Sequence, residues 1–559
     1  MSDTTFPSSA GRGHAAALDP LFQAFDRSDA PGLVVGVAQH GETFYRRGFG
    51  LASIEHAIAN TPATRMAIGS SSKHFTSLAI LLLAEDGKLD VDDDVRRHIP
   101  ELPVLAGAPT LRQLMTHTGG HRCYLDLGLM SEGMALKPRG SALAAQVRQT
   151  RANFAPGEKM IYSNGGYHLL SIVIERVSGQ GFEQFLTARI FGPMGMHDTV
   201  SVRSDLEIHR GMATLHVPRE DGGWRRGIFP SEEMSGDGAT ITTVDDMLRW
   251  LAHLRAPGRV GREDTWRQML TPATFHNGLV NHYALGLMRH DYRGVEVILH
   301  AGGVVGGNCQ MITVPSQALD IILIANGVRA NLVELSHRII DIVLADAMPG
   351  RPVLGPPRRK ASAARFAPML GTRYHVPASG LLFGFAEAPG GALGLCFMNG
   401  APQALWDKGE VLRLGLEDLA VGPLVLQAGD LALEGQPAPV ALTLRESGHA
   451  EHGERLPDMP PSNAEAGAVL VGRYRAQDLE AQARVQLEGE RLQLRIFGPQ
   501  GSQGMALQAF SHGVFGWHTA QVDVGLNGAL SVCFDAGRVA GFHLDSWRTR
   551  RMWFERIGD

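Results

Sequence analysis

Hydrophobic and polar residues form two different patterns along this chain. Up to about residue 350, strand-like runs alternate with longer apolar runs typical of helices. Residues 33–38 and 43–48 are strand-like and flank the turn 40–42, which predicts an antiparallel hairpin. Later runs of the same kind, which extend the predicted antiparallel sheet and end in a helix, are residues 296–300, 310–314, 320–326 and the helical pattern 332–345.

A turn of small residues precedes the most apolar helical run. Ser70-Ser71-Ser72-Lys73 leads into residues 77–84, and Gly87 follows. This order predicts a buried helix that opens at or near Ser70 and ends at a glycine C-cap.

Three further segments carry helix signals. Residues 110–120 predict a short helix that enters a glycine turn, in which His117 is interpreted as a structural hydrogen-bonding residue rather than a base. Residues 167–177, closed by Ser178-Gly179, predict a helix preceded by a loop with Tyr162 and Asn164. Residues 242–254 predict another helix. The acidic residues 89–95 are interpreted as a turn and helix cap, because they lack the spacing of a calcium loop.

The pattern changes after residue 349. Residues 349–364 contain four prolines and a basic cluster, which predicts a linker. Short alternating runs follow, and the polar residues 446–466, with His449 and His452, predict a second linker rather than a metal clip. Gly371-Thr372-Arg373-Tyr374 and Gly472-Arg473-Tyr474 open two similar segments, so we expect a duplicated β-barrel module of roughly a hundred residues.

Composition limits the classes of partner and compartment. The chain has 559 residues, enough for two to four domains, and its formal net charge of −5 gives no reason to expect nucleic acid or a membrane surface as a partner. Residues 1–17 lack the apolar core of a signal peptide, and we expect no transmembrane span. The four cysteines show no metal spacing, which favours reduced thiols and a cytoplasmic location.

Ser70 and Lys73 are the first candidates for chemistry. Residues three apart on a helix lie on one face, so both side chains would point into the same space. A serine hydroxyl becomes a nucleophile when a base takes its proton, and a desolvated lysine can be that base. The helix N-terminus also leaves backbone N–H groups available for an oxyanion.

Three motifs stand in order along the chain, namely Ser70-x-x-Lys73, Tyr162-x-Asn164 and His300-x-Gly302. Together they resemble the serine β-lactamase and penicillin-binding-protein superfamily over about residues 20–350. The resemblance implies an α+β fold, in which an antiparallel sheet has helices on both sides. We expect this catalytic domain at residues 1–350.

The third motif separates branches of this superfamily. Penicillin-recognising members usually carry Lys-Thr-Gly where this chain has His300-Ala301-Gly302. A mostly neutral histidine holds a carboxylate less well than lysine, which argues against strong penicillin binding. With a histidine at this position, the chain resembles the D-stereospecific aminopeptidases of the superfamily. Those enzymes carry two C-terminal lipocalin-like antiparallel barrels. We expect these all-β domains at residues 363–447 and 466–559.

The resemblance also implies roles for individual residues. Ser70 would be acylated, with Lys73 as proton acceptor and Tyr162 as a second proton carrier to the leaving group; which of the two is the kinetic base stays open. Asn164 would donate to the substrate carbonyl, and His300, within the His300-x-Gly302 motif, would tune the polar network beside Tyr162. The N–H groups of Ser70 and Gly303 would form the oxyanion hole. No metal or organic cofactor is implied.

Recognition of a substrate ammonium would need a carboxylate. Asp237 lies in Ser235-Gly236-Asp237-Gly238 and could either meet the ammonium or cap a nearby helix or turn. In the aminopeptidase relatives a loop of the last barrel reaches into the catalytic cleft. The corresponding residues 498–505 contain no acidic side chain, which keeps other acyl donors open.

The leading hypothesis is therefore a D-aminopeptidase or D-amino acid amidase that acts on short peptides, amides or esters. A carboxylesterase, a D-specific acyl transferase or cyclase, and a non-catalytic binding protein are the alternatives. The barrels either shape the cleft or join two chains in a homodimer, and the sequence does not decide between these roles.

Overall fold

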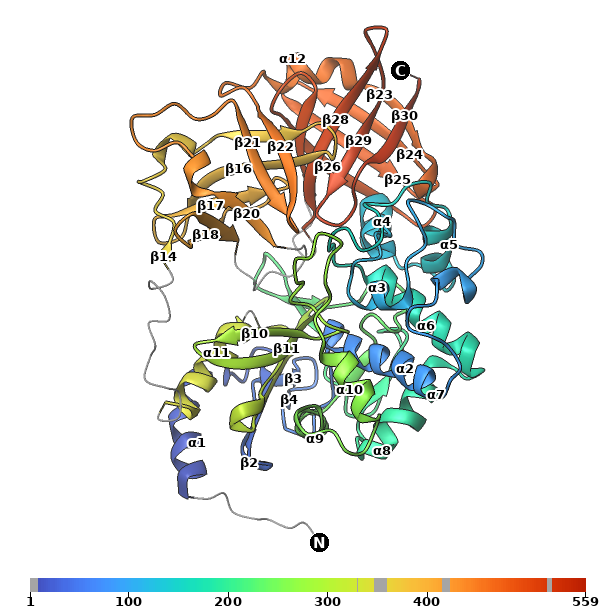
Figure 1. Cartoon of the computed structure of the whole chain (residues 1–559), viewed down its shortest axis with the longest axis vertical. Helices are drawn as coiled ribbons and strands as arrows, with labels where there is room; N and C mark the ends of the chain where they lie inside the picture. The colour runs from blue at the N-terminus through green and yellow to red at the C-terminus, as the bar shows by residue number, and fades with distance from the viewer. Residues whose placement is uncertain (1–8, 329, 346–358, 415–422, 520–524, 559) are drawn as a thin grey trace. The chain divides into compact units, whose positions relative to one another are not determined.

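A computed structural model describes residues 9–328, 330–345, 359–414, 423–519 and 525–558 of the chain (Figure 1). The chain divides into two compact units. The first comprises Met1–Ile99, Tyr167–Ala273 and His282–Leu354, and the second comprises Pro100–Gly166, Thr274–Asn281 and Gly355–Asp559. Within the described ranges, no helix combines the length and the apolar character needed to cross a membrane.

The first unit is built around a six-stranded antiparallel sheet with the strand order β10-β11-β12-β13-β1-β2. The strands predicted from the sequence are all present in it. These predicted strands are β1 (Leu33–Gln39), β2 (Glu42–Phe49), β11 (Val295–Val304), β12 (Gly307–Val314) and β13 (Leu319–Ala325), and the sequence did not predict the edge strand β10 (Met288–Tyr292).

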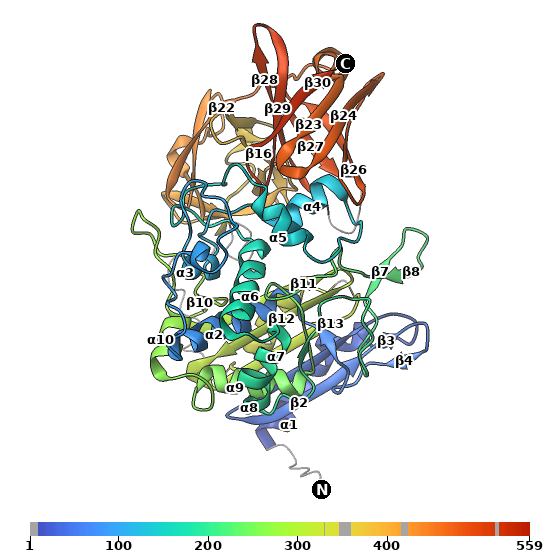
Figure 2. The same cartoon turned by 90° about the vertical axis from the view of Figure 1, so that its right-hand side faces the viewer.

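Helices cover both faces of this sheet, as predicted (Figures 1 and 2). α1 (Ser9–Phe22) and α11 (Leu332–Val343) pack together on one face, and α9 (Val244–Arg255) packs on β1 and β13 from the other. The central strand β13 is buried along its whole length, since each face of a doubly covered sheet must be apolar. The side chain of Thr243 caps α9 by accepting from the backbone N–H of Asp246.

The helix that follows the small-residue turn is also present. A 3-10 turn, η2 (Gly69–Ser72), leads into α2 (Lys73–Glu85). Gly87 takes a left-handed conformation (φ +70°), and the N–H of Lys88 donates to the carbonyl of Leu83 at 2.9 Å. This is the predicted glycine C-cap.

Short elements complete the first unit. They are η1 (Gln23–Phe25), β3 (Leu51–Ser53), β4 (Ile58–Ala59), β5 (Met66–Ala67), η3 (Val95–Arg97), α7 (Phe182–Leu186), η4 (Thr187–Phe191), α8 (Gly192–Met194), β6 (Val200–Ser201), β7 (His216–Pro218), β8 (Trp224–Arg226), β9 (Thr240–Thr242), α10 (Glu263–Leu270) and η5 (Pro315–Gln317). The acidic residues before η3 form the predicted cap, since the Asp94 carboxylate accepts from the N–H of Arg96 at 2.7 Å.

The described part of the second unit contains two β-barrels and a group of helices that precedes them in the sequence. The helices are α3 (Leu111–Met115), α4 (Tyr124–Glu132) and α5 (Ser141–Val147), and α6 (Asn164–Ser178) begins here and continues into the first unit. Thr110 and Gln113 form a capping box at the start of α3.

The first barrel has eight strands, β15 to β22, and closes because β18 pairs with β19; β14 adds a short strand beside β18. The strands are β14 (Arg359–Lys360), β15 (Arg373–Val376), β16 (Leu381–Ala388), β17 (Ala392–Phe397), β18 (Gln403–Asp407), β19 (Val411–Leu414), β20 (Leu424–Gln427), β21 (Ala441–Glu446) and β22 (His449–Arg455). Two 3-10 turns, η6 (Ala367–Met369) and η7 (Ala428–Asp430), lie between them.

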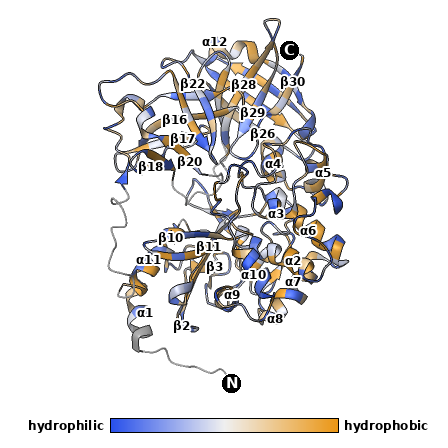
Figure 3. Ribbon diagram, viewed as in Figure 1, coloured by the Kyte–Doolittle hydropathy of each residue, from blue (hydrophilic) through white to orange (hydrophobic). Residues whose placement is uncertain are grey.

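The second barrel is closed by β23 to β30 (Figure 2). Its elements are α12 (Asn463–Gly467), η8 (Ala468–Leu470), β23 (Gly472–Ala476), η9 (Gln477–Leu479), β24 (Ala481–Glu488), β25 (Arg491–Phe497), β26 (Ser502–Ala509), β27 (Val514–Thr519), β28 (Asn527–Asp535), β29 (Arg538–Ser546) and β30 (Met552–Gly558). Strands such as β24 alternate buried and exposed residues, and both colours of the hydropathy scale appear along the barrel strands (Figure 3).

Both predicted linkers need correction. Residues 349–358 of the first lie outside the described part of the chain, and Arg359–Lys360 form β14 instead. The second prediction, residues 446–466, is wrong for its first half, which forms the turn after β21 and the whole of β22. The first barrel therefore extends to Arg455, beyond the predicted limit at 447, while the division into three domains stays a prediction.

Helix α4 belongs to the hydrophobic core of the second barrel. Leu127 and Met130 of α4 are buried in the same cluster as Tyr474, Trp517 and Phe542 of the barrel. The fully buried guanidinium of Arg122 donates to the Asp478 carboxylate at 2.8 Å. These contacts explain why residues 100–166 group with the C-terminal barrels. In the sequence, these residues lie between two segments of the first unit.

Asp545 gives the second barrel a pH-dependent stability. Its side chain is fully buried, and its carboxylate accepts from the N–H of Arg551 at 2.5 Å. Burial raises the pKa of this carboxyl from 3.8 to about 6. Because the folded state binds the proton more tightly than the unfolded chain, this residue's contribution to stability falls as pH rises from about 4 to about 7, by ~2–3 kcal/mol.

Asp545→Asn should remove this slope. We expect the free energy of unfolding of the variant, minus that of the natural protein, to increase by ~2–3 kcal/mol between about pH 4 and about pH 7, because only the natural protein loses stability there. Denaturant unfolding at both pH values measures it. Asp535→Asn, at an exposed position on β28, is the matched control. Parallel pH profiles for the natural protein and Asp545→Asn would contradict the assignment.

Candidate active site

Ser70 and Lys73 meet in the first unit, as predicted. Lys73 is the first residue of α2 and is fully buried. Its Nζ donates to Ser70 Oγ at 3.0 Å and to the backbone carbonyl of Asp237 at 2.5 Å. The aromatic ring of Tyr167 lies with its centroid 5.4 Å from Nζ. These contacts fix the amine beside the hydroxyl, where a neutral amine can accept the serine proton.

Asp237 serves this arrangement through its backbone. Its carboxylate accepts from the N–H of Ser235 at 3.2 Å and so caps the turn that presents the Asp237 carbonyl to Lys73. Asp237 therefore caps a turn, and its binding of a substrate ammonium stays a prediction.

Strand β11 passes unusually close to the nucleophile turn. β10 pairs with β11 only as far as Leu299, and the η2 turn packs on β11 beyond that point. A Cβ atom on Gly302 would lie 1.8 Å from the carbonyl oxygen of Ile68, and one on Gly69 would lie 2.7 Å from that of Gly303. Glycine is therefore required on both sides of the contact, and Gly69 also has a positive φ of +51°. The backbone of Gly303 thus lies beside the residue that precedes the nucleophile.

His300 is a neutral residue in this site. Burial, followed by the nearby Lys73, lowers its pKa to about 3. Its Nδ1 lies 2.5 Å from the carbonyl oxygen of Ala301, so Nδ1 carries the proton, because a carbonyl can only accept. Nε2 then accepts from the hydroxyl of Tyr283 at 2.8 Å.

Tyr283 is the functional-site residue that the sequence did not reveal. It is almost completely buried and precedes β10 in an irregular segment without a motif of its own. A lone tyrosine before a strand gives no chemical signal, so only the fold brings it to His300.

Tyr162 and Asn164 belong to the second unit. The ring of Tyr162 packs against that of His117 with centroids 4.0 Å apart, and the guanidinium of Arg548 lies 5.2 Å from the Tyr162 ring centroid. Asn164 is buried and is the first residue of α6, whereas the sequence predicted a loop position.

His117 has the structural role predicted for it. Its Nδ1 accepts from the N–H of Ser163 at 3.1 Å, within the segment that carries Tyr162 and Asn164. The residue itself takes a left-handed conformation, with φ +59°. His117 therefore holds the second motif in place.

The hairpin at residues 498–505 contacts α4 in the second unit. Residues 498–501 join β25 to β26, residues 502–505 are the start of β26, and the N–H of Gln500 donates to the Glu132 carboxylate at 2.9 Å. Lys137, whose pKa burial lowers to about 8, lies 3.9 Å from Glu132 and donates to the carbonyl of Gly133. The hairpin is thus hydrogen-bonded to the buried carboxylate of Glu132, the last residue of α4.

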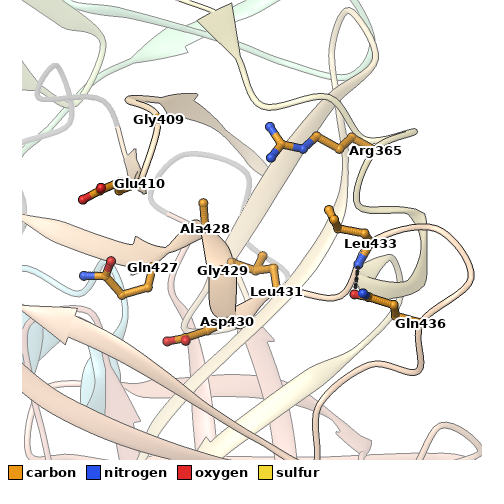
Figure 4. A pocket seen from close by; sticks show the side chains of 10 residues that line it. All are labelled: Arg365, Gly409, Glu410, Gln427, Ala428, Gly429, Asp430, Leu431, Leu433 and Gln436. Atoms are coloured by element: carbon orange, nitrogen blue, oxygen red, sulfur yellow. Dashed lines mark hydrogen bonds between the residues drawn. The ribbon is translucent and has the colours of Figure 1, made fainter.

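A pocket of about 550 Å³ lies at one end of the first barrel (Figure 4). Its polar side chains are Arg365, Glu410, Gln427, Asp430 and Gln436. Its lining residues include no serine, cysteine, histidine, lysine or tyrosine, so it offers no nucleophile paired with a base. This pocket is therefore not a candidate for covalent catalysis.

The fold and the Ser70–Lys73 pair define a serine hydrolase of the β-lactamase type. A family model described as "Beta-lactamase" matches residues 18–344, more than half of the chain, and the chain belongs to this family.

Two relatives match this chain over nearly its whole length, including the C-terminal barrels. The D-aminopeptidase of Brucella canis is 25% identical over 545 residues, which cover 94% of this chain and 96% of the relative. The D-aminopeptidase of Gluconobacter oxydans is 26% identical over 539 residues, covering 95% and 97%.

Solved structures share the fold. The octameric penicillin-binding protein homologue from Pyrococcus abyssi covers 97% of this chain and 99% of its own, with a TM-score of 0.53 and 17% identity. The penicillin binding protein from Bacillus halodurans covers 58% of this chain and 98% of its own, with a TM-score of 0.50 and 25% identity. The first of these matches extends the common architecture over nearly the whole chain.

Proposed function

We propose that this chain is a serine hydrolase of the D-aminopeptidase or D-amino acid amidase type. It would release N-terminal D-residues from short peptides, amides or esters through an acyl-enzyme on Ser70. The observation that carries the proposal is the 3.0 Å hydrogen bond from Lys73 Nζ to Ser70 Oγ beside the backbone of strand β11. The full-length similarity to two D-aminopeptidases supports the substrate class.

In the proposed mechanism, neutral Lys73 takes the hydroxyl proton while Ser70 Oγ attacks the substrate carbonyl carbon. The N–H groups of Ser70 and Gly303 stabilise the oxyanion, and the close approach of η2 to β11 supports this pairing. Tyr162 carries a proton to the leaving amine, and Asn164 donates to the substrate carbonyl. Water then hydrolyses the acyl-enzyme and restores Ser70.

His300 and Gly302 give the third motif a positioning role. Neutral His300 bonds to Tyr283 instead of offering a cation, and Gly302 admits the turn of the nucleophile. A neutral third motif supports the prediction that this enzyme does not hold β-lactam carboxylates strongly.

The location and assembly of the enzyme are further proposals. We propose a cytoplasmic enzyme because all four cysteines are free thiols, and burial raises the pKa of Cys309 to about 12, which keeps that thiol unreactive. Assembly as a homodimer remains a proposal, with no metal or organic cofactor needed for the mechanism above.

Turnover of matched D- and L-alanine nitroanilides and of a short nitrophenyl ester tests the function. We expect hydrolysis of the D-anilide in preference to the L-anilide, with the Ser70→Ala protein as the blank. Ester hydrolysis alone would instead make the chain a carboxylesterase, because esters need less protonation of the leaving group. Equal cleavage of the D- and L-anilides would remove the stereospecific part of the proposal.

A further inference from the structure

Arg548 of the last barrel faces the second catalytic motif. It lies in the turn between β29 and β30, and its guanidinium carbon is 5.2 Å from the ring centroid of Tyr162. The nearest carboxylate that pairs with it is Asp126, whose Oδ1 lies 3.9 Å from Arg548 Nη1. That distance exceeds a hydrogen bond.

The turn that carries Arg548 is held rigidly within the second unit. Asn153 donates to the carbonyl of Arg548 and accepts from the N–H of Arg550, each at 2.8 Å. The buried guanidinium of Arg122 donates to the carbonyls of Arg550 and Arg551 at 2.8 and 2.9 Å. The backbone of the turn that carries Arg548 is therefore already ordered before a ligand binds.

The guanidinium of Arg548 retains its donors for a ligand. Among the described residues it donates no hydrogen bond, and its side chain is 29% exposed. Arg122 and Arg550 of the same region are almost fully buried and are bonded to protein acceptors. A planar fork of N–H donors with partial solvent access matches a carboxylate in two-point geometry.

We propose that Arg548 binds the C-terminal carboxylate of the leaving group, so that the enzyme prefers short peptides with a free C-terminus over the corresponding amides. This rests on the proposed function, which gives Tyr162 the proton transfer to the leaving amine. A cation fixed beside Tyr162 then lies next to the leaving amino acid. The third motif has His300 where penicillin-recognising members carry a lysine, so a substrate carboxylate would need another cation.

The test compares D-alanyl-glycine with D-alanyl-glycinamide, with D-alanine nitroanilide as the measure of basal hydrolysis. We expect a higher kcat/KM for the free acid in the natural protein. Arg548→Gln should lower kcat/KM for the free acid by roughly 10- to 100-fold, mainly through KM, so that the ratio of acid to amide falls toward one. Arg548→Lys keeps the charge without the fork and should give an intermediate ratio.

Two further variants keep the result interpretable. Arg538→Gln changes an exposed arginine of the β28–β29 hairpin and should leave the ratio unchanged. Arg548→Gln combined with Asp126→Asn removes both charges, so that Asp126 is not left buried alone if the single variant folds poorly.

The outcomes separate this proposal from the proposed function. Cleavage of the nitroanilide without any preference for the free acid would overturn the role of Arg548 alone. An equal loss on both peptides in Arg548→Gln, with the ratio preserved, would overturn it too, because Arg548 would then act only through Tyr162 or the fold. Absence of all three activities would defeat the proposed function and this proposal with it.

Discussion

Ser70→Ala and Lys73→Met should each lower kcat by about 10⁴-fold or more, and the double variant should be no worse than either single one. The reason is the 3.0 Å contact between Lys73 Nζ and Ser70 Oγ, because neither group can perform its step without the other. Groups that act as one unit lose the same step whichever is removed. Steady-state turnover of a D-alanine nitroanilide measures all three variants.

Methionine is the suitable replacement for Lys73. The side chain is fully buried, so a residue of similar length keeps the packing of α2 while the amine is removed. The carbonyl of Asp237 then loses its donor, which should cost about 1–3 kcal/mol of stability. Thermal unfolding therefore accompanies the kinetics. Lys88→Met, at an exposed lysine just after α2, is the control for loss of a positive charge.

A double variant much less active than either single one would show that Ser70 and Lys73 act in separate steps. Substantial turnover by Lys73→Met with Ser70 intact would point to Tyr162 as the kinetic base. Labelling by a fluorophosphonate distinguishes these cases, since it reports the reactivity of Ser70 independently of the leaving group.

The parts of the site that could be predicted are those fixed by local sequence. Ser70 and Lys73 are three residues apart, so the start of one helix brings them together. The hairpin of β1 and β2 needs only a short turn. Arg548, by contrast, reaches Tyr162 from a distant segment, and Tyr283 reaches His300 from a segment without a motif. Asp237 contributes a carbonyl that any residue type could supply.

The misread strand β22 shows why polarity alone misleads. Its inward positions are Glu451 and Gly453, so the alternation of hydrophobic residues expected of a barrel strand is missing. Glu451 is tolerated inside because it pairs with Lys159. Gly453 is small because a Cβ there would lie 2.8 Å from the Phe383 ring and 2.9 Å from Cβ of Tyr374. Both reasons depend on residues far away in the sequence.

Gly302→Ala should reduce kcat/KM by about 10²-fold or more, although it alters no group that reacts. The added methyl would lie 1.8 Å from the carbonyl oxygen of Ile68 and 3.1 Å from the N–H nitrogen of Ser71. These are backbone atoms, so no change of side-chain rotamer relieves the clash. The turn η2 and strand β11 must separate, which moves the N–H of Ser70 away from that of Gly303. Overpacking of this kind should also cost about 1–3 kcal/mol of stability.

Gly303→Ala is the matched control for the stability part of this prediction, because a Cβ on Gly303 meets no atom within 4 Å and its backbone needs no left-handed conformation. We expect its Tm to stay at the natural value while that of Gly302→Ala falls. An unchanged Tm together with full activity in Gly302→Ala would show that the nucleophile turn does not need its close contact with β11. If Gly302→Ala lost activity but kept its Tm, the contact would still be needed for catalysis. The displacement would then disturb the oxyanion hole without weakening the fold.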